Sequence, residues 1–264
     1  MSSRPSVSLP SGAPGPVSHR SALRALVTNE ARLLLREPGI VVWAVVIPVV
    51  ATVVLAVLPA TRHPITDLGG WSVSQLYLPV LVLFTASLLG VQGLPTVLAQ
   101  YRADGVLKRL RTTPVAPSQL LVAIMVVLGT ATLVVTVVLV AIPAALGNPP
   151  PGNITAFALV TVLAMAALVS LGTLVSALVP NPRVATGLGT LLTFALWFFA
   201  GMWIPRTVFP EALARVADLT PTGAASAALL EAMHGGWPDL TQVLVLLAWT
   251  ALPALVAARM FRWE

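Results

Sequence analysis

Hydrophobic residues along the chain fall into six long runs separated by short polar segments. Each run approaches or exceeds the roughly 20 residues that an α-helix needs to cross the hydrocarbon core of a bilayer. The runs cover residues 40–60, 76–99, 120–146, 154–179, 184–204 and 240–258. All nine acidic residues lie outside these runs, as do all Lys, Arg and His residues. The pattern predicts an all-α fold, namely a polytopic integral membrane protein with six transmembrane helices.

A basic amphipathic segment precedes the first run. Residues 21–37 read SALRALVTNEARLLLRE, and polar side chains recur there every four residues, while leucines and a valine lie mostly on another side of the predicted helix. The recurring side chains are Arg24, Thr28, Arg32 and Arg36. Such a pattern is typical of an amphipathic helix in a membrane interface, and Pro38-Gly39 would end it. An ordinary solvated helix is the alternative.

Composition excludes a soluble domain. Hydrophobic residues make up 57% of the chain and charged residues only 9%, whereas a soluble domain carries about 25% charged residues. The chain has no cysteine, so its function depends on no disulfide or thiolate.

The positions of Lys and Arg predict the topology. Twelve of the fifteen lie in the N-terminal segment, the loop at 100–118, the turn at Arg183 and the C-terminus, and the other three are Arg62, Arg206 and Arg215. By the positive-inside rule both termini and the 100–118 loop are cytoplasmic, and the protein lies in the plasma membrane. Residues 61–73, 147–153 and 205–238 then face outward. The net charge of +6 therefore serves orientation and contacts with membrane lipids, and no nucleic-acid partner is expected.

These assignments divide the chain into three parts. Residues 1–20, rich in Ser, Pro and Gly, predict a flexible cytoplasmic tail without the apolar run of a signal peptide. Residues 21–37 form the amphipathic interfacial helix, and residues 38–264 form the six-span transmembrane domain.

Motifs for catalysis on this chain are absent. No phosphate-binding loop of the G-x-x-x-x-G-K-[ST] type occurs, and the single lysine, Lys108, is followed by Arg109. No H-E-x-x-H or G-x-S-x-G motif occurs, and His19, His63 and His234 lie far apart. We expect no catalytic residue, metal or cofactor here. The lack of an ionisable residue within the runs also argues against an ion-coupled carrier.

The loop at 100–118, QYRADGVLKRLRTTPVAPS, predicts a short amphipathic helix at 104–113. Asp104 is placed to cap its start and Pro114 to end it. Three apolar side chains fall at helical spacing among basic ones. The apolar residues are Val106, Leu107 and Leu110, and the basic residues are Lys108, Arg109 and Arg111. A plain basic loop with one or two helical turns is the alternative.

This loop resembles the coupling-helix region of ABC-2 type ABC transporter permeases, whose pattern is E-R-E-x-G-T-L-x-R-L-R-x-T-P. The matching residues are Arg102, Gly105, Leu107, Arg109, Leu110, Arg111, Thr113 and Pro114. Tyr101 and Ala103 stand where the pattern has glutamates, and Val106 stands where it has threonine. The resemblance implies that residues 102–114, including Asp104 and Lys108, contact an ATPase subunit.

Two further segments resemble the same family. LLLREPG at 33–39 is similar to its entry into the first span, and residues 199–223 are similar to its stretch after the fifth span. The resemblance implies short re-entrant helices on the outer face before the last span, and the sequence places them at 210–217 and 223–234.

The function implied is that of the transmembrane permease subunit of an ATP-driven exporter. Its substrate would be an amphipathic drug, antibiotic, lipid or lipid-linked glycan. The partners would be ABC ATPase subunits, which bind ATP and Mg²⁺, and a second permease copy or paralogue. The alternatives are a non-transporting membrane scaffold and an ATP-independent carrier of neutral lipids.

Aromatic residues late in the fifth run form a candidate substrate path. Trp197, Phe198 and Met202 are the residues proposed for it, and Phe198 and Met202 are four positions apart and share a helix face. An interfacial belt of aromatic side chains at the span end is the alternative.

Overall fold

The computed structural model of the protein describes residues 19–106, 109 and 117–260. Within them the chain is helical apart from loops, turns and one isolated β-bridge, Ile65 to Trp71. Six helical stretches are long and apolar enough to cross a membrane. They are span 1 (Pro38–Val57), span 2 (Val73–Ala103), span 3 (Ser118–Ala145), span 4 (Ile154–Leu178), span 5 (Pro182–Ala200) and span 6 (Leu240–Met260). The predicted all-α fold with six transmembrane helices is confirmed.

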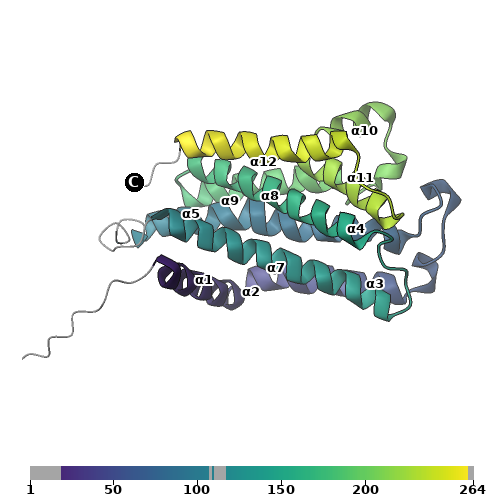
Figure 1. The fold of residues 1–264 in the computed structure, drawn as a ribbon, viewed down its shortest axis with the longest axis horizontal. Coiled ribbons are helices and arrows are strands. Elements are labelled where there is room, and N and C mark those ends of the chain that lie inside the picture. Colours follow the sequence, from purple (N-terminus) through teal and green to yellow (C-terminus); the bar gives the residue numbers. More distant parts are fainter. Residues whose placement is uncertain (1–18, 107–108, 110–116, 261–264) are drawn as a thin grey trace, which may run out of the picture.

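The helix before the first span, α1 (His19–Arg36), matches the predicted segment at 21–37. It packs beside α7 (Pro117–Ala145), the helix of span 3 (Figure 1). The helix ends where the chain turns at Glu37, and α2 (Pro38–Val41) begins at the proline. Its place in a membrane interface stays a prediction, and the predicted tail at 1–20 falls almost wholly outside the described residues.

Spans 1 and 2 are interrupted by π-helical segments, which the sequence did not predict. In span 1, η1 (Val42–Val46) separates α2 from α3 (Ile47–Val57). In span 2, η4 (Leu88–Gly93) separates α4 (Val73–Ser87) from α5 (Leu94–Ala103). The buried Thr85 Oγ1 donates to the Ala44 carbonyl oxygen at 3.0 Å and so joins the two interrupted spans. Such π-helical insertions occur often at functional sites.

Span 4, helix α8 (Ile154–Leu178), lies at the centre of the bundle and packs against spans 2 and 6. The run of small residues in it permits this close packing. Gly172 of α8 lies so close to Gly90 of η4 that a side chain on Gly172 would overlap the Gly90 carbonyl group. The ideal Cβ position of Gly189 in α9 (Pro182–Ala200) is 3.0 Å from the Val91 carbonyl oxygen. The π-helix of span 2 thus packs closely against a glycine of span 4 and a glycine of span 5.

The three segments predicted to face outward gather at one end of the bundle. Gly152 N–H donates to Met233 O at 3.1 Å, and the Trp71 and His234 rings stack with centroids 3.7 Å apart. The Ala56 carbonyl near the end of span 1 accepts hydrogen bonds from the Arg62 guanidinium and the Asn148 amide. These contacts join the loops after spans 1 and 3 and the segment before span 6.

Two helices precede span 6, as predicted. They are α10 (Glu211–Asp218) and α11 (Pro221–Met233), after a short 3-10 turn, η5 (Arg206–Val208). Gly235, with φ 93°, follows α11. Most of α11 is buried against spans 2, 4, 5 and 6. Arg206 of η5 pairs with Asp218 and donates to the Gly223 carbonyl, so it fastens both helices to the end of span 5.

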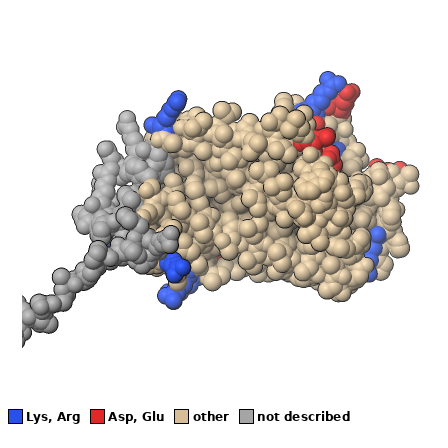
Figure 2. Space-filling view, in the orientation of Figure 1, with Lys and Arg blue, Asp and Glu red and all other residues tan. Residues whose placement is uncertain are grey.

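Charged side chains visible in Figure 2 lie toward the two ends of the molecule, with an uncharged band between them. The band is covered by apolar residues of the spans, including Val134, Val137 and Leu252, which are 40% exposed or more. Helix α12 (Leu240–Met260), which forms span 6, shows much of its surface in this band. An uncharged apolar belt of this kind is what a bilayer requires.

Candidate functional site

The segment expected to contact an ATPase follows α5 at the end opposite to the gathered loops. Gly105 has φ +69°, a backbone conformation that favours glycine. Arg109 N–H donates to the Gly105 carbonyl at 3.1 Å, and Val106 and Arg109 are helical. A helix therefore begins directly after Gly105. The other residues predicted for it lie outside the described residues, and they are Leu107, Lys108, Leu110, Arg111, Thr113 and Pro114.

Two residues just before that helix are tied to the bundle. The Arg102 guanidinium donates to the Ser176 carbonyl near the end of span 4. Asp104 lies at the C-terminal cap of α5, and its carboxylate accepts from the Gln100 amide at 3.1 Å. The predicted cap by Asp104 on the following helix depends partly on Leu107, outside the described residues, and stays a prediction.

Tyr101, at a glutamate position of the family pattern, contacts a glutamate from elsewhere in the chain. Its hydroxyl lies 3.0 and 2.9 Å from the two carboxylate oxygens of Glu30 in α1. Glu30 is only 7% exposed. Burial raises the pKa of its carboxyl above the usual value, and hydrogen bonds from Tyr101 and Asn29 partly oppose that rise. This contact connects the helix before span 1 with the end of span 2.

A groove of about 390 Å³, here called the threonine groove, lies between spans 1, 2 and 5. Gln92 Nε2 donates to Thr190 Oγ1 at 3.0 Å, and the hydroxyls of Thr96 and Thr186 lie 3.2 Å apart. The rest of its lining is apolar or aromatic. It consists of Gly39, Ile40, Trp43, Ala44, Leu88, Gly93, Phe194 and Trp197. A concave apolar surface with a few placed polar groups is typical of a small-molecule site.

Trp197 holds the only buried indole N–H without a hydrogen-bond partner among the described residues. Its ring stacks on Phe84 with centroids 4.3 Å apart and lies 5.2 Å from the ring of Phe194. An unsatisfied buried donor costs about 1–3 kcal/mol. The indole ring is therefore held in a fixed orientation beside the groove, and its buried N–H has no partner among the described residues.

The structure places the three residues of the predicted substrate path in different surroundings. Trp197 lines the threonine groove. Phe198 instead packs against Phe199 and Phe209, at centroid distances of 5.4 and 5.8 Å. Met202 lies beyond the end of span 5, where its carbonyl is 3.5 Å from the Tyr77 hydroxyl. The structure brings neither Phe198 nor Met202 to the groove lining.

Sequence reasoning missed the polar residues of the groove, Gln92, Thr96, Thr186 and Thr190. A signal was present, because Thr186 and Thr190 are four residues apart in the fifth run and Gln92 is an amide within the second. Polar side chains in a spanning helix often face a partner helix or a cavity.

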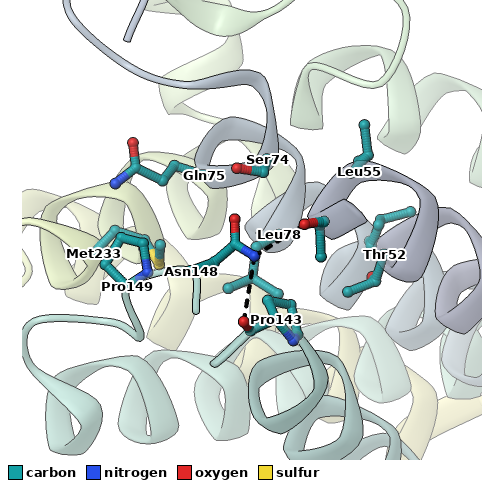
Figure 3. Close-up of a pocket in the computed structure, with 11 residues that line it drawn as sticks. Thr52, Leu55, Ser74, Gln75, Leu78, Pro143, Asn148, Pro149 and Met233 are labelled. Atoms are coloured by element: carbon teal, nitrogen blue, oxygen red, sulfur yellow. Dashed lines mark hydrogen bonds between the residues drawn. The ribbon is translucent and has the colours of Figure 1, made fainter. Parts of the chain in front are cut away.

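A much smaller cavity of about 20 Å³ lies among the gathered loops (Figure 3). Asn148 points into this region and donates to the Ala56 and Pro143 carbonyls at 3.2 and 3.3 Å. The buried Thr52 hydroxyl lines it without a partner among the described residues. This volume suits one water molecule and excludes a larger ligand. Among the described residues, no three His, Asp or Glu side chains gather as metal ligands would.

Comparison with known proteins supports the resemblance seen in the loop at 100–118. No curated protein matches the chain. The family model described as ABC-2 type transporter matches residues 21–234, from α1 through α11. The match thus spans five of the six transmembrane helices and both helices before the last one. The protein therefore belongs to the ABC-2 type transporter family.

Proposed function

We propose that this permease is the transmembrane subunit of an ATP-driven exporter in the plasma membrane. Its substrate is an amphipathic compound, such as a drug, an antibiotic, a lipid or a lipid-linked glycan. Separate ABC ATPase subunits bind ATP and Mg²⁺, and a second permease copy or paralogue completes the transporter. The observation that carries the proposal is the threonine groove, because its lining combines a broad apolar surface with fixed polar groups in a chain of transporter type.

Helix α5 connects the groove with the segment proposed to meet the ATPase. Helix α5 carries Thr96 on the groove wall and Arg102 at its end, and the next helix begins directly after Gly105. A packed helix transmits displacement along its axis. Movement of the loop by an ATPase would therefore shift one wall of the groove and bias the bundle between two access states.

Reconstitution tests the proposal. The permease would be co-purified with candidate ABC ATPases and placed in liposomes, and ATP hydrolysis would be measured across a panel of amphipathic compounds. We expect no hydrolysis by the permease alone and compound-dependent stimulation by the complex. A complex that assembles but responds to no amphipathic compound and transports none would contradict the proposal.

Topology gives the first prediction. The proposal places Ser118 in the cytoplasm and Thr207 outside, and both side chains are exposed at opposite ends of the molecule. Because the chain has no cysteine, Ser118→Cys and Thr207→Cys each introduce a single thiol. In intact cells an impermeant maleimide should label Thr207→Cys and spare Ser118→Cys until the membrane is opened. The reverse pattern would reverse the orientation.

Trp197 gives the second prediction. Trp197→Phe removes the unpartnered N–H but retains a ring against Phe84. Loss of one hydrogen bond to substrate, about 0.5–1.5 kcal/mol, should raise the substrate concentration for half-maximal ATPase stimulation by about twofold to twelvefold. The permease itself should lose little stability from the missing donor.

Trp249→Phe is the matched control, because it removes an indole of the same size from span 6. Trp249 Nε1 donates to the Leu219 carbonyl at 2.8 Å, far from the groove lining. This variant should lower the thermal midpoint slightly and leave the half-maximal concentration unchanged. Equal substrate responses in both variants would remove Trp197 from the substrate path.

A further inference from the structure

A second large cavity, here called the α1 cavity, lies between α1, α2, α5 and α7. Its volume is about 570 Å³, within the range of ligand pockets in proteins. It shares Gly39, Ile40 and Thr96 with the threonine groove, so the α1–α2 junction and one side of α5 form a wall between them. The two cavities differ in chemistry, because the groove is lined by neutral residues and the α1 cavity by two carboxylates.

The first carboxylate, Glu30, is buried, and its described partners carry no positive charge. Both of its oxygens accept from the Tyr101 hydroxyl. The ion pairs formed among the described residues, Arg206–Asp218 and Arg215–Glu211, lie at the other end of the molecule. A buried carboxylate is costly unless it is paired with a cation. Tyr101 and Asn29, both uncharged, supply hydrogen bonds to a group that has acceptor capacity for several.

The remaining lining is amphipathic. Glu37 and Gln100, both exposed, lie at the opening, and no Lys, Arg or His among the described residues lines the cavity. Leucine, isoleucine and valine side chains form the rest, among them Leu34, Ile124 and Leu128. The charge of the lining favours a cation, and its apolar part favours a hydrocarbon chain. Helix α1 meets the bundle at the end where α5 finishes (Figure 1), and residues of both helices line the cavity.

We propose that the α1 cavity binds an amphiphile with a primary ammonium headgroup, which pairs with Glu30 while its hydrocarbon chain lies along Leu34, Ile124 and Leu128. Tyr101 is a positioning residue that holds the Glu30 carboxylate toward the cavity. The ligand comes either from the bilayer, as an aminophospholipid, or from solution, as a long-chain amine. Its binding links α1 to α5 just before the segment that continues to Gly105.

The test uses the full chain in phosphatidylglycerol nanodiscs, without any ATPase, so its outcome does not depend on the proposed function. Three probes carry a photoactivatable diazirine in the hydrocarbon chain, and they are phosphatidylethanolamine, hexadecylamine and phosphatidylglycerol. Labelled peptides are then located by mass spectrometry. We expect an ammonium probe to label peptides of α1, α5 and α7 at least about tenfold more than the anionic probe, because only the ammonium group can form a charged hydrogen bond with Glu30.

Variants assign the binding to Glu30. Glu30→Gln should reduce labelling by about tenfold or more, since it removes the charge. Glu37→Gln is the matched control at the exposed rim and should change labelling by less than about threefold. Tyr101→Phe keeps the carboxylate and removes only the Tyr101 hydroxyl, so it should reduce labelling by about threefold to tenfold. This variant provides the test if Glu30→Gln yields too little folded protein.

The outcomes separate clearly. Labelling by phosphatidylethanolamine alone identifies a membrane lipid, labelling by hexadecylamine alone identifies a free amphiphile, and labelling by both supports the shared ammonium chemistry. Labelling of these peptides by the anionic probe to the same extent would overturn the proposal. So would labelling by neither ammonium probe, or unchanged labelling in folded Glu30→Gln and Tyr101→Phe.

Discussion

Replacing Gly172 with alanine is expected to prevent most of the protein from folding. The added methyl group would overlap the carbonyl of Gly90, which belongs to the π-helix at the centre of span 2. Overpacking of a core usually costs about 1–3 kcal/mol. Here the obstacle is a backbone carbonyl in a segment that packs against spans 4 and 5, and a backbone group has no rotamer to change. We therefore expect a cost at or above the upper end of that range. Yield of monodisperse protein after detergent extraction, and its thermal midpoint, measure the effect.

Gly129→Ala is the matched control for this prediction. Gly129 lies within α7, and a Cβ added there meets no atom within 4 Å. Alanine favours a helix over glycine by about 1 kcal/mol, so this variant should be as stable as the natural chain or slightly more so. If Gly172→Ala behaves like Gly129→Ala, the close crossing of spans 2 and 4 is not required for folding.

Leu107→Asp and Leu110→Asp are expected to abolish assembly with the ATPase or to uncouple it. The argument comes from the sequence, because both residues lie outside the described part of the chain. Apolar anchors that become desolvated at an interface often contribute about 2 kcal/mol or more, which is roughly a thirtyfold loss of affinity when one is removed. A new carboxylate in an apolar groove adds the cost of an unpaired charge.

Co-purification of the ATPase and substrate-stimulated hydrolysis measure this second effect. Arg111→Ala is the control within the same segment, because an exposed ion pair contributes only about 0–1 kcal/mol. All three variants should extract and migrate like the natural permease, since none changes a spanning helix. Natural levels of ATPase binding and stimulation in both leucine variants would show that the loop is not the coupling element.

The spans and the helices before span 6 were predictable because their determinants are local. A bilayer sets the length and the apolar character of each spanning helix. Turn residues mark the limits of the short helices, as Pro210 does before α10 and Gly235 after α11. The grouping of the loops at one end follows because consecutive spans cross the bundle in alternate directions.

The π-helix of span 1 was not predictable, because its segment looks like any apolar helix. The residues of η1 read VWAVV, without a residue type that breaks an α-helix. What allows the irregular backbone is a tertiary contact, the hydrogen bond from Thr85 to the Ala44 carbonyl 41 positions away. The sequence around either residue does not indicate such a long-range contact.

The candidate sites show the same division. Trp197 was selected because it is aromatic and near a span end, but the same criterion selected Phe198, which packs elsewhere. The polar side of the threonine groove needs spans 2 and 5 side by side, as the Gln92–Thr190 hydrogen bond shows. The contact of Glu30 with Tyr101 joins residues 71 positions apart. Spacing along one helix cannot identify any of these pairs.

The hydrogen bonds to the Ala56 carbonyl have a consequence for how span 1 moves. Arg62 and Asn148 fix the C-terminal end of this helix to its own following loop and to the end of span 3. At the other end Trp43 is 57% exposed, and the helix is separated from α1 by the turn at Glu37. We expect residues 38–43 to move more than the rest of span 1, because these residues lie beyond both the Ala56 contacts and the hydrogen bond from Thr85 to Ala44. The mouth of the threonine groove at Gly39 would then widen while the gathered loops at the other end remain still.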